Sequence, residues 1–189
     1  MKRYGKLASA IVLFAAVTML TACGNSVTPE MEQIAVEMDG QIVKSKVTSA
    51  NATAKALMQF TNAYITECVS RGGKEWESGA ITISCADGNC TVSGYDVDAC
   101  KPKSMDKTFA QMLREDFAIT DSCFAKIYIN NTGMANAAVF TSETSDLTES
   151  DCPDEQAFKD GFWKWNGKTE GVSPSGAVIG TVPILSLKQ

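Results

Sequence analysis

The sequence predicts an α+β domain in which one long amphipathic helix packs on an antiparallel sheet. Between Val47 and Cys68, apolar side chains recur at alternating steps of three and four residues, which is the period of a helix. After Gly73, short segments alternate between apolar and polar residues and are separated by turn residues, as antiparallel strands are. A helix followed mainly by strands is typical of the α+β class.

The predicted long helix presents a single apolar stripe, and Gly72-Gly73 ends it with the residue type that helix C-termini prefer. A shorter helical pattern over residues 31–38 precedes it, and Asp39-Gly40 interrupts or bends that pattern. Small residues fill positions 45–54. They allow another backbone to approach closely, but they also occur on solvated faces, and we favour the solvated face. The stripe consists of Val47, Ala50, Ala54, Leu57, Thr61, Tyr64 and Cys68, with Met58 and Ile65 beside it.

Three hairpins and one further helix are predicted beyond Gly73. The first hairpin consists of residues 80–85 and 90–93 around Asp87-Gly88, and it is followed by a helix that Ser104 caps and that ends near Phe117. The second hairpin consists of residues 124–130 and 137–141, and the third starts at residues 162–165 and turns at Asn166-Gly167. A last strand is predicted over 177–185, and its Pro183 requires a sheet edge.

The first 22 residues have the layout of a secretory signal. Lys2, Arg3 and Lys6 form the charged region. The apolar segment over residues 7–20 is shorter than the roughly 20 residues that a membrane-spanning helix needs. The next feature, Leu20-Thr21-Ala22-Cys23, resembles the lipobox of bacterial lipoproteins. The alternatives are an ordinary secretory signal and an uncleaved membrane helix.

The lipobox resemblance implies that residues 1–22 are removed and that Cys23 carries diacylglycerol as the first residue of the mature protein. Residues 23–30 then form a tether, and residues 31–189 form a single α+β domain. The lipid on Cys23 would anchor the protein to a membrane of the cell envelope, facing away from the cytoplasm. Two or more acyl chains suffice for stable anchoring.

An even number of cysteines follows Cys23, and in an exported chain such a set indicates three disulfides with 15 possible pairings. Cys85 and Cys90 flank the loop of the first predicted hairpin and form the only pairing that we expect individually. A metal or redox cluster is disfavoured because the sequence contains no Cys-x-x-Cys. The six candidates are Cys68, Cys85, Cys90, Cys100, Cys123 and Cys152.

The order of elements resembles the globular part of type IV pilins and pseudopilins over about residues 30–185. In that family a long helix packs its C-terminal half on an antiparallel sheet, and a disulfide often closes a variable C-terminal segment. The resemblance implies a role in assembly. The chain departs from the family because its apolar segment is followed by Cys23, and residues 31–56 are too polar for a filament core.

Composition excludes several function classes. Removal of residues 1–22 takes away three of the 17 basic residues and none of the 22 acidic ones, which leaves a net charge of −8 and argues against nucleic acid as a partner. The sequence has no histidine, so His-dependent triads and His-based zinc sites are excluded. Chemistry that uses carboxylates alone is not excluded. We expect no cofactor and no metal.

Two segments are candidates for binding. Trp163 and Trp165 lie on one face of a predicted strand, where they form either a platform for a glycan or a wall of the core. The same alternatives apply to Phe158, Phe162 and Trp76. Six acidic residues lie between Glu143 and Glu155, and a solvated loop explains them better than a calcium site because the spacing of an EF-hand loop is missing.

The sequence therefore predicts a non-catalytic cell-surface lipoprotein with a binding or assembly role. Its expected partners are the membrane, through Cys23, and a cell-surface protein or glycan, through residues 143–170. The alternatives are a carbohydrate- or peptidoglycan-binding surface protein and an exported hydrolase that uses only carboxylates.

Overall fold

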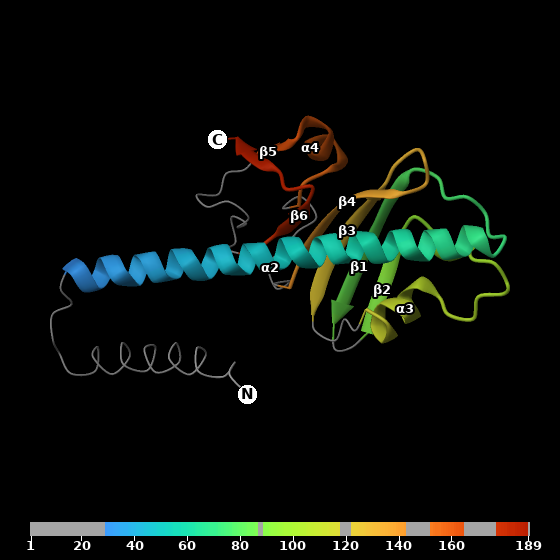
Figure 1. Cartoon of the computed structure of the whole chain (residues 1–189), viewed down its shortest axis with the longest axis horizontal. Coiled ribbons are helices and arrows are strands. Elements are labelled where there is room, and N and C mark those ends of the chain that lie inside the picture. The colour runs from blue at the N-terminus through green and yellow to red at the C-terminus, as the bar shows by residue number, and fades with distance from the viewer. Residues whose placement is uncertain (1–28, 87–88, 118–121, 143–151, 165–176, 189) are drawn as a thin grey trace. The chain divides into compact units, whose positions relative to one another are not determined.

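The computed structural model describes residues 29–86, 89–117, 122–142, 152–164 and 177–188 (Figure 1). The chain forms two compact units, residues 1–42 and 43–189. The elements are α2 (Pro29–Ser70), β1 (Gly79–Ala86), β2 (Asn89–Gly94), the 3-10 helix η1 (Val97–Cys100), α3 (Phe109–Glu115), β3 (Cys123–Ile129), β4 (Ala135–Thr141), α4 (Glu155–Asp160), β5 (Phe162–Lys164), β6 (Gly180–Val182) and β7 (Ser186–Lys188).

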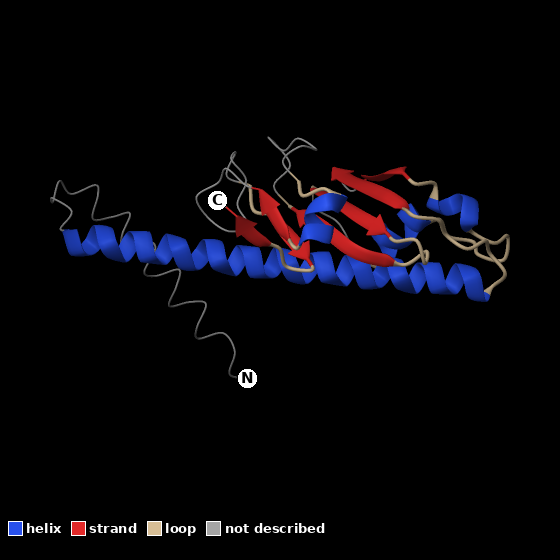
Figure 2. Cartoon of the chain, turned by 90° about the horizontal axis from the view of Figure 1, so that it is seen from above, coloured by secondary structure: helices blue, strands red, loops and turns tan. Residues whose placement is uncertain are grey.

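The sheet contains five antiparallel strands in the order β2-β1-β3-β4-β6, and a second pair, β5 and β7, is parallel. Within the larger unit, the strands form a layer along one side of α2 (Figure 2). The α+β class and the antiparallel sheet predicted from the sequence are thus confirmed. Both hairpins predicted between residues 80 and 141 are confirmed as well.

The predicted stripe of α2 is the face that packs on the sheet. Ala54, Leu57, Tyr64 and Cys68 are almost completely buried, and Thr61 is buried among them, where its hydroxyl donates to the carbonyl of Leu57 at 2.9 Å. α3 adds Phe109 and Leu113 to this core, which the strands complete with Ile81, Ile83 and Ile127. This is the main hydrophobic core of the domain.

α2 ends at the predicted glycines through a Schellman motif. Gly72 has a positive φ of 85°, its N–H donates to the carbonyl of Val69 at 3.0 Å, and the N–H of Gly73 donates to the carbonyl of Cys68 at 2.8 Å. α2 passes through Asp39-Gly40, where the sequence predicted an interruption or a bend in the helical pattern.

Two asparagines of α2 fix the helix to the strands. The side-chain amide of Asn62 donates to the carbonyl of Ala135 at 2.9 Å and accepts from its N–H at 2.7 Å. The side chain of Asn51 accepts from the N–H of Thr181 at 2.7 Å. Each side chain therefore satisfies polar backbone groups where a strand meets the helix.

A second, smaller core covers the opposite face of the sheet. Tyr128, which alternates with the inward residues of β3, packs there with Trp163, Ile179 and Leu185. Its hydroxyl donates to the carbonyl of Pro153 at 2.8 Å. The C-terminal part of the chain thus forms a third layer against the sheet.

Two sequence-based expectations are corrected. The second helix begins at Phe109, not after Ser104, because Thr108 and Gln111 form a capping box. The sequence predicted that residues 162–165 start a hairpin that turns at Asn166-Gly167. In the described residues, β5 pairs instead with β7, and the two strands are parallel, whereas the strands of a hairpin are antiparallel. β6 forms the edge of the main sheet, and Pro183 directly follows it, as expected for a proline near an edge.

Candidate functional site

A cleft of about 350 Å³ lies at the C-terminal end of α2, within the larger unit. Ile65 and Val69, from the last turns of α2, form one wall, and the turn between β3 and β4, with Gly133 and Met134, forms the other. Trp76 also lines the cleft. The cleft therefore brings together two stretches that are far apart in the sequence, residues 65–76 and 132–134.

Gly133 allows the turn between β3 and β4 to reach this position. Its φ of 74° lies in the region that glycine prefers, and a Cβ there would meet the carbonyl oxygen of Trp76 at 2.6 Å. Asn130 shapes the same turn because its side-chain oxygen accepts from the N–H groups of Thr132 and Met134. A rigid turn thus holds Met134 at the wall of the cleft.

The indole of Trp76 is enclosed by aromatic rings. The ring of Tyr95 stacks on it at a centroid distance of 5.7 Å, and Tyr64 meets it edge-on at 6.0 Å. Trp76 is 4% exposed, and among the described residues its Nε1 has no hydrogen-bond partner. A buried donor without an acceptor costs free energy.

The chemical character of the cleft follows from these residues. Val69 and Met134 are exposed apolar side chains, and Glu75 places a carboxylate at the lining. The cleft suits an apolar side chain. Because the ring of Tyr95 covers a face of Trp76, that face is closed to a stacked sugar.

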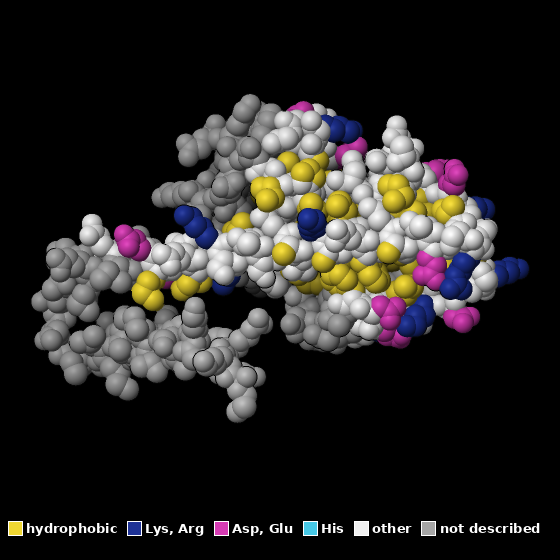
Figure 3. Space-filling model, in the orientation of Figure 1, with side chains coloured by type: hydrophobic (Ala, Val, Ile, Leu, Met, Phe, Trp, Pro, Cys, Tyr) yellow, Lys and Arg dark blue, Asp and Glu magenta, His cyan; other side chains and the backbone are white. Residues whose placement is uncertain are grey.

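A half-buried apolar patch lies between α2 and α3. Phe60, Met112 and Phe117 pack there against the main core, and the rings of Phe60 and Phe117 are 5.4 Å apart. Apolar side chains gather on the surface next to α2 in this region (Figure 3). The patch closes the edge of the core where the short α3 meets the long helix.

The aromatic residues predicted to bind a glycan do not form an exposed platform in the described structure. Trp163 is 8% exposed and belongs to the second core, and Phe158 packs on Tyr128 at a centroid distance of 5.4 Å. Trp165 and most of the acidic segment, residues 143–151, lie outside the described residues. The burial of Trp163 favours the core wall, the alternative that the sequence left open.

The structure joins Cys85 and Cys90 in a disulfide with a Cα–Cα distance of 4.1 Å, which is the one pairing that the sequence singled out. The other four cysteines predicted to form bridges are buried. Cys68 and Cys100 lie in the main core and are not bonded to each other. Burial, the largest cause, raises the pKa of the Cys68 thiol.

The predicted signal of residues 1–22 and the lipobox-like Leu20–Cys23 motif lie outside the described residues, and so does most of the predicted tether over residues 23–30.

No helix among the described segments is both long and apolar enough to cross a membrane. The same segments contain no group of three or more metal-ligating side chains that could hold an ion.

The cleft itself could not be predicted from the sequence. Trp76 was one of several aromatic candidates, but Val69 and Met134 carry no local signal because only the fold brings them together.

Comparisons with protein families, with curated proteins and with solved structures found no match for this chain.

Proposed function

We propose that this chain is a lipid-anchored protein of the bacterial cell envelope that acts by binding and not by catalysis. The Leu20–Cys23 motif supports the anchor, and the cleft lined by Trp76, Val69 and Met134 supports the binding role. In this proposal the domain is pilin-like, with α2 in the place of the pilin helix and the five-stranded sheet beneath its C-terminal half.

The cleft is the observation that carries the binding role. It offers exposed apolar walls, so it fits a segment of a protein that presents an apolar side chain. A glycan is the less suitable occupant, because it needs many polar partners and open aromatic faces. The proposed partner is therefore a protein at the cell surface.

Metabolic labelling with a fatty acid tests the anchor. The wild-type chain should incorporate the label, and Cys23→Ser should not, because the acyl groups are attached through that thiol. Cys90→Ser is the matched control, since it removes a cysteine outside the Leu20–Cys23 motif and should leave labelling unchanged. Equal labelling of the wild type and Cys23→Ser would contradict the lipid anchor.

Photo-cross-linking on intact cells tests the binding role. A photoreactive residue at position 134 should give a discrete protein adduct that disappears when Val69→Asp places a charge in the cleft. Position 184 is the control, because Ile184 is 70% exposed and does not line the cleft. The same adducts at both positions, or saturable hydrolysis of peptidoglycan or peptide by the pure protein, would overturn the proposed function.

A further inference from the structure

Two buried cysteines lie where the end of α2 meets η1. Cys68 belongs to the last turns of α2, and Cys100 is the last residue of η1. Both side chains belong to the main core, and the structure describes both as unbonded thiols. Two thiols from elements that are far apart in the sequence thus enter the same core.

The dipeptide Gly73-Lys74 holds the backbones of these two cysteines side by side. The N–H of Gly73 donates to the carbonyl of Cys68 at 2.8 Å, and the N–H of Lys74 donates to the carbonyl of Cys100 at 3.2 Å. A Cβ at position 73 would collide with both carbonyl oxygens, so glycine is needed for this close approach. Burial is the largest cause that raises the pKa of the Cys68 thiol, and the charge of Cys100 is a further cause. Neighbouring backbones are the first geometric requirement of a disulfide.

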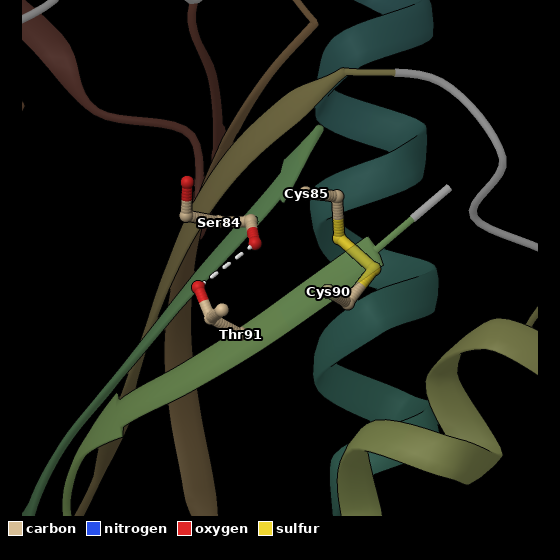
Figure 4. Close-up of a disulfide and its surroundings, with 4 residues drawn as sticks. All are labelled: Ser84, Cys85, Cys90 and Thr91. Carbon is tan, nitrogen blue, oxygen red and sulfur yellow. Dashed lines mark hydrogen bonds between the residues drawn. A yellow bond between two sulfur atoms is a disulfide. The ribbon is translucent and has the colours of Figure 1, made fainter. Parts of the chain in front are cut away.

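The Cys85–Cys90 disulfide closes the turn of the β1–β2 hairpin, at the other end of the sheet (Figure 4). Gly79, the first residue of β1, packs on the ring of Tyr95, whose hydroxyl lies 3.4 Å from the sulfur of Cys100. Cys85 lies near the opposite end of this 8-residue strand, which is about 20 Å away at the usual rise per residue. The existing bridge is therefore remote from Cys100.

The remaining two cysteines also lie elsewhere in the domain. Cys123 is opposite Cys85 in the strand register, so it lies at the same distant end of the sheet. Cys152 belongs to the second core, on the opposite face of the sheet. Among the cysteines that the structure describes, Cys100 is therefore the one that Cys68 can reach.

Cys100 has polar partners that suit it to attack first. Its sulfur lies within hydrogen-bond distance of the Tyr95 hydroxyl and donates to the carbonyl of Glu75 at 3.8 Å. The Tyr95 hydroxyl accepts from the N–H of Glu77 at 2.9 Å, so its own proton can be donated to the sulfur. Such a donor stabilises the thiolate, which is the form that attacks a disulfide. Cys100 is 6% exposed and Cys68 is 0% exposed, so an oxidant meets Cys100 first.

We propose that Cys68 and Cys100 are the site of a second disulfide, which an oxidant that itself carries a disulfide introduces. The thiol of Cys100 gives its proton to water, and its thiolate bonds to one sulfur of the oxidant, whose other sulfur leaves with the electron pair of the broken bond. Cys68 then loses its proton and bonds to the sulfur of Cys100, and the second sulfur of the oxidant leaves. The two cysteines give up two electrons, and the oxidant takes up these electrons and two protons as it becomes two thiols.

The bridge would cross-link α2 to η1 beside the cleft. Glu75 and Trp76 line the cleft, and the carbonyl of Glu75 already contacts the sulfur of Cys100. The bond would therefore fix the wall of the cleft that these two residues form. This effect does not depend on the lipid anchor or on the partner that the cleft binds.

Oxidation of the folded mature protein with oxidised glutathione tests the pairing. After alkylation of the remaining thiols and digestion at acid pH, mass spectrometry should show the Cys68 peptide joined to the Cys100 peptide. Amide hydrogen exchange over residues 71–76 should be slower than in Cys100→Ser by about tenfold or more, because the bridge restricts local opening. Alkylated Cys68 and Cys100, or a bridge from either one to a different cysteine, would overturn the proposal. Equal exchange in both proteins would overturn the fixed wall.

Two single variants test the order of attack. Cys68→Ser should trap glutathione on Cys100 as a mixed disulfide, because the thiol that resolves it is missing. Cys100→Ser is the matched control and should leave Cys68 as a thiol, since Cys68 is fully buried. Glutathione on Cys68 in the control, with none on Cys100 in Cys68→Ser, would overturn this order. The peptide map of the wild type requires no variant, so it decides the pairing even where a substitution prevents folding.

Discussion

The backbone of Gly180 in β6 lies directly against the backbone of Ala50 in α2. A Cβ at position 180 would fall well inside the van der Waals distance of the Ala50 carbonyl group. The neighbouring bond from the N–H of Thr181 to the side chain of Asn51 fixes the two elements at this distance. At Gly180 the edge strand therefore meets the helix through backbone atoms.

Gly180→Ala should destabilise the domain by about 3 kcal/mol, at the upper end of the usual cost of overpacking, because backbone atoms must move apart. Chemical denaturation of the purified domain measures this. Gly40→Ala is the matched control, since position 40 has open space around it and lies within α2. That variant should gain about 0.5–1 kcal/mol, because alanine loses less conformational entropy in a helix than glycine does. Equal effects of both substitutions would contradict the close contact.

The small residues of α2 show what the sequence could predict and what it could not. Their small size is explained by a close backbone at Ala50, which Gly180 touches, whereas Thr48, Ser49 and Ala52 are exposed. Close approach of another backbone therefore explains Ala50, and a solvated face explains the exposed positions. The sequence could not show which positions belong to which explanation, because the approaching strand is about 130 residues away in the chain and no local pattern indicates where it packs.

Periodic and capping signals predicted the elements that depend on neighbours in sequence. The apolar stripe of α2, its end at Gly72 and the hairpin that places Cys85 opposite Cys90 are examples. The partner of β5 could not be predicted, because its parallel pairing with β7 is set by long-range packing. The same is true of the cleft, whose walls come from segments that share no motif.

Leu57→Ala should lower the free energy of unfolding by about 2–5 kcal/mol, because Leu57 is fully buried between α2 and the sheet and its removal leaves a cavity. Lys55→Ala is the control from the exposed face of the same helix and should change stability by less than about 0.5 kcal/mol. Urea denaturation of both variants measures the difference. An unchanged midpoint for Leu57→Ala would show that this face of α2 is not a core surface.

Stability at alkaline pH should depend on Tyr64. Burial, followed by the charge of Asp98, raises the pKa of Tyr64 above its ordinary value of 10.0. Above pH 10 the unfolded chain has lost this proton and the folded protein has kept it, so the unfolded state binds fewer protons and the free energy of unfolding falls as the pH rises.

Tyr64→Phe removes this titration together with the hydrogen bond that the Tyr64 hydroxyl donates to Asp98 Oδ1 at 3.1 Å. The variant should be less stable than the wild type near neutral pH, and the difference should shrink above about pH 10, where only the wild type loses stability through this tyrosine. Denaturation curves from about pH 8 to about pH 11 measure the difference. A constant difference over that range would show that Tyr64 titrates equally in both states.

Trp76→Phe should leave the free energy of unfolding within about 1 kcal/mol of the wild type, because the loss of packing is offset by removal of a buried donor that has no acceptor among the described residues. Tyr128→Phe is the contrasting case. Its hydroxyl donates to the carbonyl of Pro153, and its removal should cost about 1–3 kcal/mol because that buried carbonyl loses its partner. Denaturation of both variants measures these costs. If Trp76→Phe costs as much as Tyr128→Phe, the indole N–H already has an acceptor in the free protein.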